Sequence, residues 1–67
     1  MSSDEKARLR TLLTYWVEHN REHGQEFREW ADKARKMGQG EVASDLLKAV
    51  NNMDKVTEIL SGILKRL

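Results

Sequence analysis

Two long stretches with helical apolar spacing, separated by one short break, constrain the fold of this chain most. The sequence has no proline, and its only clustered glycines lie in Gly38-Gln39-Gly40. On either side of this break, apolar residues recur at alternating intervals of four and three, the heptad spacing of packed helices. We therefore predict an all-α fold with a single domain over residues 1–67. It is an antiparallel two-helix hairpin, with helices over about 3–37 and 41–66 and a turn at 38–40.

The predicted core follows one line of residues, here called a seam, along each helix. The first seam is polar only at Asn20 and His23, and its members are Leu9, Leu13, Trp16, Asn20, His23, Phe27, Trp30, Ala34 and Met37. The second seam consists of Val42, Leu46, Ala49, Met53, Val56, Leu60, Ile63 and Leu67. In this register Trp16 faces Gly62, so that a large side chain meets a small one, and both tryptophans are expected in the core.

Both ends of the first predicted helix carry residues that typically begin or end a helix. Ser2 stands three residues before Glu5, which is the spacing of a capping box. Gly38 follows the cationic Arg35 and Lys36, and glycine readily adopts the left-handed conformation that often ends a helix. These signals predict where the first helix begins and where the turn starts.

The small size of the domain and the width of its apolar surface predict self-association. A chain of 67 residues buries a marginal core, and this one has no cysteine with which to form a disulfide. Leu47, Ile59 and Leu64 widen the apolar stripe of the second helix beyond what one neighbouring helix covers. We therefore expect a homodimer in which two hairpins form a four-helix bundle.

The charge balance and the lengths of the apolar runs argue against two classes of partner, nucleic acids and membranes. Twelve Lys and Arg residues face eleven Asp and Glu residues, which gives a net charge of +1 with the two signs interspersed. A nucleic-acid-binding module normally has a basic stripe, so no nucleic-acid partner is expected. The apolar runs are too short to cross a membrane, and the polar start Met1-Ser2-Ser3-Asp4-Glu5 does not resemble a secretory signal. A cytoplasmic location is expected.

A histidine-rich stripe in the first helix is the candidate functional site. His19 and His23 are four residues apart, so their side chains lie on one face of a helix, and Glu22 and Glu26 follow each of them by three residues. Imidazole and carboxylate groups suit divalent transition metals, namely nickel, cobalt, zinc or copper. The stripe therefore predicts a metal site formed by His19, His23, Glu22 and Glu26, which a second copy would complete.

Two other interpretations of this stripe remain open. In the first, Asn20 and His23 form a polar layer that fixes helix register, as a single buried asparagine does in coiled coils, and the chain is a purely structural or adaptor module. In the second, His19-Asn20-Arg21-Glu22-His23 matches the H-x-x-E-H pattern of some zinc peptidases. A hairpin without loops offers no substrate cleft, so we expect that the protein is not an enzyme.

A longer part of the chain resembles a known domain. The residues that carry the resemblance are Leu12 to His23, together with Phe27, Trp30-Ala31, Lys33-Ala34 and Glu41-Val42-Ala43. They resemble a small uncharacterised prokaryotic helical domain with a Glu-His-Asn-x-x-His core, which is associated with nickel- or cobalt-handling proteins. The resemblance implies a metal-binding or metal-chaperone accessory that uses His19 and His23. The sequence departs from that domain at Gly24, where alanine is usual, and glycine loosens the helix beside the histidines.

Overall fold

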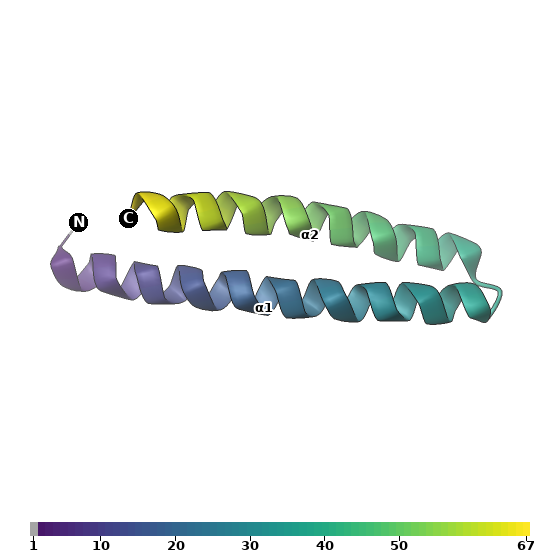
Figure 1. Cartoon of the computed structure of the whole chain (residues 1–67). Helices are drawn as coiled ribbons and strands as arrows, with labels where there is room; N and C mark the ends of the chain where they lie inside the picture. The colour runs from purple at the N-terminus through teal and green to yellow at the C-terminus, as the bar shows by residue number, and fades with distance from the viewer. Residues whose placement is uncertain (1) are drawn as a thin grey trace.

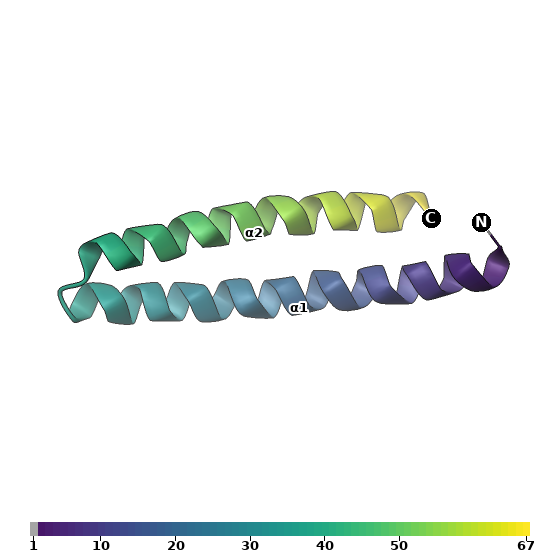
Figure 2. The same cartoon turned by 180° about the vertical axis from the view of Figure 1, so that it is seen from behind.

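The protein is an antiparallel hairpin of two long helices, as a computed structural model describes it for residues 2–67. Helix α1 spans Ser3–Lys36 and helix α2 spans Gly40–Arg66. Figures 1 and 2 show the two helices side by side from opposite views, with α1 extending past the end of α2. The hairpin measures 52 × 14 × 13 Å, so it is one layer of two helices. The predicted all-helical hairpin is confirmed, and the predicted helix boundaries lie within one residue of these.

The ends of α1 are held by the contacts that the sequence predicted. The Ser2 hydroxyl accepts a hydrogen bond from the Glu5 backbone N–H at 3.2 Å, which satisfies one of the free donors of the first turn. At the other end Gly38 has φ +80°, and the backbone N–H groups of Gly38 and Gln39 donate to the carbonyls of Arg35 and Ala34. These two backbone hydrogen bonds form a Schellman motif, after which the chain enters α2 directly.

The core is narrower than predicted. On both helices alternate members of the predicted seam are replaced by the next residue along the chain, while the other members, such as Leu13, Ala34 and Leu46, keep their predicted places. The buried residues of α1 are Leu13, Val17, Gly24, Ala31 and Ala34, and those of α2 are Ala43, Val50 and Thr57. Half-buried Asn20, Phe27, Leu46, Met53, Leu60 and Leu64 continue the same two lines. The prediction that Trp16 and Trp30 lie in the core of the hairpin is wrong, because Val17 and Ala31 take their places.

The physical reason for this shift is the size of the residues that face the partner helix. Ala31, Ala34 and Ala43 form one buried cluster near the turn, with Leu46 packed against it. Small side chains at these positions let two helices approach closely, whereas an indole would hold them apart. The expected contact of Trp16 with Gly62 is also wrong, since a methyl group added to Gly62 would meet no atom within 4 Å.

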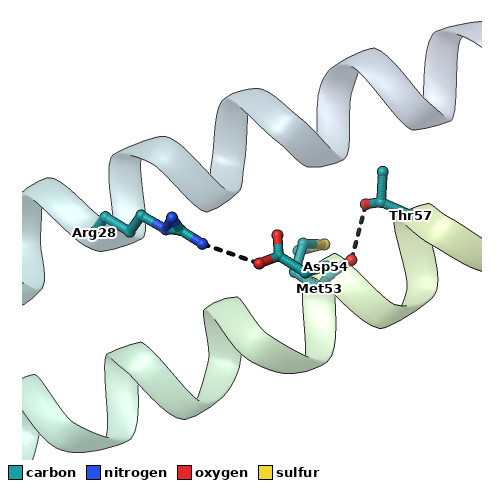
Figure 3. A network of polar contacts seen from close by, with 4 residues as sticks. All are labelled: Arg28, Met53, Asp54 and Thr57. Carbon is teal, nitrogen blue, oxygen red and sulfur yellow. Dashed lines mark hydrogen bonds and ion pairs between the residues drawn. The ribbon is translucent and has the colours of Figure 1, made fainter.

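The shift gives the hairpin two different sides. Arg28 and Asp54 each follow an inward residue, and they form an ion pair of 2.9 Å across the two helices (Figure 3). This pair marks what we call the charged side. Residues that precede the inward residues lie on the opposite side, because the two helices are antiparallel. From α1 that apolar side carries Leu9, Leu12, Trp16, His19, His23, Trp30 and Met37, and from α2 it carries Val42, Ala49, Val56, Ile59 and Ile63. The polar residues Glu26, Lys33, Asp45 and Asn52 also precede inward residues and lie on the same side.

Of the residues that the structure describes, Thr57 is the polar side chain that is buried at the interface. The Thr57 hydroxyl donates to the Met53 carbonyl of the preceding turn at 2.8 Å, as Figure 3 shows. The bond satisfies the hydroxyl within its own helix, so α1 need not supply a partner. Among residues 2–67, neither helix has an apolar stretch long enough to cross a membrane.

Candidate metal site

Four rings follow one another along α1 and position the two histidines, with the outer contacts stacked and the His19–His23 contact edge to face at 82°. Tyr15, His19, His23 and Phe27 are spaced four residues apart, so each ring lies one turn from the next. Ring centroids are 5.2 Å apart for Tyr15 and His19, 4.3 Å for the two histidines and 6.0 Å for His23 and Phe27. The line runs from exposed Tyr15 to half-buried Phe27 at the helix interface. The neighbouring rings therefore restrict the orientations of both imidazoles.

The two imidazoles point their Nε2 atoms at each other. The distance between these atoms is 2.9 Å, that of a hydrogen bond. Without a metal, one Nε2 must carry a hydrogen and donate a hydrogen bond, and the other Nε2 must accept that bond, because two lone pairs would repel each other. A metal bound to both nitrogens at about 2.1 Å would separate them by about 3.0 to 3.4 Å, depending on the coordination geometry. The pair is thus close to the separation that a metal with adjacent imidazole ligands requires.

The carboxylates of the predicted site do not join the histidines. Within residues 2–67, no three His, Asp or Glu side chains converge in an arrangement that could hold a metal ion. Glu22 and Glu26 are exposed, as is His19, while His23 is half-buried. The structure therefore brings together two of the four predicted ligands. Two nitrogen ligands fill half of a tetrahedral shell, so a metal at this site needs further ligands.

Asn20, the other polar member of the predicted seam, is separate from this pair. It is half-buried at an inward position of α1, between Val17 and Gly24. His23 instead lies on the apolar side, one residue before the inward position of Gly24. The sequence interpretation had placed Asn20 and His23 in one polar layer. In the single hairpin they occupy two adjacent faces of α1.

Sequence reasoning missed the supporting role of Tyr15 and Phe27. Their rings stack on the outer faces of the histidine pair, and both lie four residues from a histidine. That spacing was the available signal, since side chains at i and i+4 are neighbours on a helix. The two histidine rings are consequently held by contacts with Tyr15 and Phe27 rather than by contacts with the carboxylates of Glu22 and Glu26.

Comparison with known proteins places the chain in a family without assigning it an activity. A family model described as a domain of unknown function, DUF8180, matches residues 9–67. The chain belongs to this family. The DUF8180 match includes the paired parts of both helices, both histidines and the turn. No curated protein and no solved structure matches the chain. The family description agrees with the expected small uncharacterised domain, and the association with nickel or cobalt stays a prediction.

Proposed function

We propose that this protein is a non-enzymatic, self-associating helical module that binds a divalent transition metal through His19 and His23. The observation that carries the proposal is the 2.9 Å separation of the two Nε2 atoms. Nickel, cobalt and zinc accept imidazole nitrogen as a ligand, so the pair suits any of the three. Such a module would act as a metal-binding accessory, in line with the resemblance to nickel- and cobalt-handling proteins.

Calorimetric titration of tag-free protein with nickel, cobalt and zinc tests this proposal directly. Because ligands must be unprotonated, affinity should fall as the pH drops below about 6.5, where imidazoles in general take up a proton. Binding to the folded state should also raise the melting temperature as free metal increases above its Kd. Melting that is unchanged at millimolar concentrations of all three metals would contradict the proposal.

Variants of the four candidate ligands separate their roles. Replacing both histidines (His19→Ala with His23→Ala) should abolish metal binding while preserving helical content, since neither side chain is fully buried. Glu22→Gln keeps the shape of the side chain and removes a carboxylate that lies outside the pair. It should leave affinity within about twofold, an energy difference of about 0.4 kcal/mol. Glu26→Gln reports in the same way on the second carboxylate.

A second function is a purely structural or adaptor role in which polar residues set the register of self-association. The observation that favours it is Asn20, which is half-buried at the helix interface. One buried polar residue among apolar neighbours specifies register at some cost in stability. Under this alternative, Asn20→Leu and His23→Leu should each stabilise the helices, yet yield several oligomeric states. A single oligomeric state for both variants, measured by sedimentation, would argue against it.

A further inference from the structure

The apolar side of the hairpin is unpartnered in the single chain. Within residues 2–67, most of the large hydrophobic side chains that remain exposed lie on this side, namely Leu12, Trp16, Trp30, Met37, Val42, Val56 and Ile59. Tyr15 and Leu47 are the exposed hydrophobics that lie elsewhere. The charged side, with Arg28 and Asp54, is already suited to water. On the apolar side, Glu26, Lys33, Asp45 and Asn52 lie between the hydrophobic residues. Seven exposed large hydrophobic side chains on one side of so small a chain nevertheless favour an interaction site.

The dimensions of this side suit a second copy of the same chain. The backbone extents of this side, 52 by 14 Å, give a projected area of the same order as the roughly 800 Å² that each partner buries in a stable interface. The hairpin also needs such burial, because within residues 2–67 the large side chains that are fully enclosed are only Leu13 and Val50. A two-helix layer that covers one face with an identical layer gives a four-helix bundle, which has a core enclosed by helices on all sides.

The order of residues on the apolar side is symmetric about one point. On α1 the side begins at Leu9 and ends at Met37, and His23 is the midpoint of this stretch. Trp16 and Trp30 lie seven residues, or two helical turns, on either side of His23. A twofold axis that passes His23 at right angles to the helices therefore brings Trp16 of each copy to Trp30 of the other.

The second helix has a matching arrangement around the same level. Counting along the antiparallel helices, the Arg28–Asp54 pair places residue 59 at the level of His23 and Ala34 opposite Ala43 places residue 54 there, so that Val56 lies within about one turn of this level. Seven residues to either side lie Ala49 and Ile63, one small and one large. The same axis brings each Ala49 opposite an Ile63, which is the large-to-small packing that close contact requires.

From these observations we infer that two hairpins pack antiparallel through their apolar sides, with the twofold axis beside His23 and Val56. The inference deepens the proposed function and rests on it for the metal. His19 and His23 of each copy then lie next to those of the other at the centre of the interface. Two histidine pairs supply four imidazole nitrogens, so the second copy completes the shell that one chain leaves half filled. One metal ion per two chains is the resulting stoichiometry.

Single cysteines provide a direct test of this packing, because the chain has no cysteine of its own. Val56→Cys places thiols next to the axis, whereas Glu58→Cys places a matched thiol on the charged side two residues away. Under mild oxidation with a chelator present, Val56→Cys should form disulfide-linked dimers several-fold faster than Glu58→Cys. Mixing Ala49→Cys with Ile63→Cys chains should give the mixed dimer in preference to either self-linked dimer.

The outcomes distinguish the interface from the metal site. Equal cross-linking of Val56→Cys and Glu58→Cys, with helical circular dichroism for both, overturns the inference, as does a monomer that instead partitions onto neutral lipid vesicles. Nickel titration of the wild type supplies the second measurement. One nickel per chain bound to a monomer contradicts the shared site but keeps the histidine pair as ligands. Cross-linking at Val56 without any metal binding keeps the interface and contradicts the proposed function.

Discussion

Gly24 lies buried in the middle of the hairpin interface, yet a methyl group added there would meet no atom within 4 Å. A groove on the charged side, lined by Arg21, Gly24, Gln25, Arg28 and Asp54, runs past this position. The sequence left two explanations open, a close approach of another backbone and a tolerated but costly glycine. In the single hairpin the helices do not approach closely enough at Gly24 to require the first.

Gly24→Ala should therefore stabilise the protein by about 1 kcal/mol, the difference in helix propensity between the two residues. The added methyl group fills free space beside α2 and meets no steric resistance. Urea unfolding followed by circular dichroism measures the change. Gly38→Ala is the opposite control, because φ +80° strains any side chain, and it should destabilise the protein by about 1 kcal/mol. A destabilised Gly24→Ala would show that another chain approaches this position.

The histidine pair shows what sequence spacing predicts at the scale of single residues. The interval of four between His19 and His23 correctly predicted that both rings lie on one face of α1. The same reasoning added Glu22 and Glu26, which are equally near along the helix. Their side chains are flexible and exposed, and nothing in the hairpin attracts them to the imidazoles. Spacing thus predicts a shared face, but the convergence of four ligands depends on contacts that it does not specify.

At the scale of the helices, their ends were more predictable than the faces they present to each other. Ser2 and Gly38 act through local backbone contacts, so the residues themselves predict the outcome. The facing residues depend on a choice between two neighbouring lines, Trp16 with Trp30 or Val17 with Ala31. Both lines have the heptad interval, and one residue separates them. The hairpin uses the line with smaller side chains, which leaves the indoles for another surface.

The Arg28–Asp54 pair crosses the two helices but should contribute little to stability. Both side chains are more than half exposed, so water and salt screen their attraction. We expect a double-mutant cycle with Arg28→Ala and Asp54→Ala to give a coupling of less than about 1 kcal/mol, and less again in 1 M salt. Chemical unfolding of the four proteins provides the measurement. A large coupling that persists in high salt would mean that the pair is covered in the assembled protein.

Acidification should slightly weaken the last turns of α1, where Asp32 lies. A hydrogen bond from Lys36 and its charge, with a smaller effect of Arg35, hold the pKa of Asp32 below its usual value of 3.8. Because the folded pKa is lowered, this contribution is present above pH 3.8 and is lost as the pH falls through the lowered value. Asp32→Asn should remove this part of the pH dependence, which amide hydrogen exchange near Lys36 can follow.

At the scale of the whole molecule, the sequence predicts that one hairpin alone cannot cover all of its apolar side chains. Leu47 and Ile59 were expected to face water in a lone hairpin, and both are exposed, whereas Leu64 is half-buried. The sequence could not predict which surface of the hairpin remains uncovered. That surface depends on whether Trp16 and Trp30, or Val17 and Ala31, face α2. Once Val17 and Ala31 face α2, the indoles and His23 lie together on the apolar side. The position of the histidines in any dimer follows from that choice.

Trp30 and Tyr15 allow the apolar side to be tested with a closely matched pair of variants. The two aromatic residues are equally exposed in the hairpin, 55% for Trp30 and 56% for Tyr15, but only Trp30 lies on the apolar side. If two copies pack through the apolar side as proposed, Trp30→Glu should give a helical monomer, because a carboxylate is costly to bury there without a partner. Tyr15→Glu removes a similar area from a surface that faces water, and because Tyr15 also stacks on His19 the comparison is made with a chelator present. Self-association of Tyr15→Glu should then persist. Sedimentation at tens of micromolar, with circular dichroism as the folding control, measures both. If the two variants have the same mass, the apolar side does not hold the copies together.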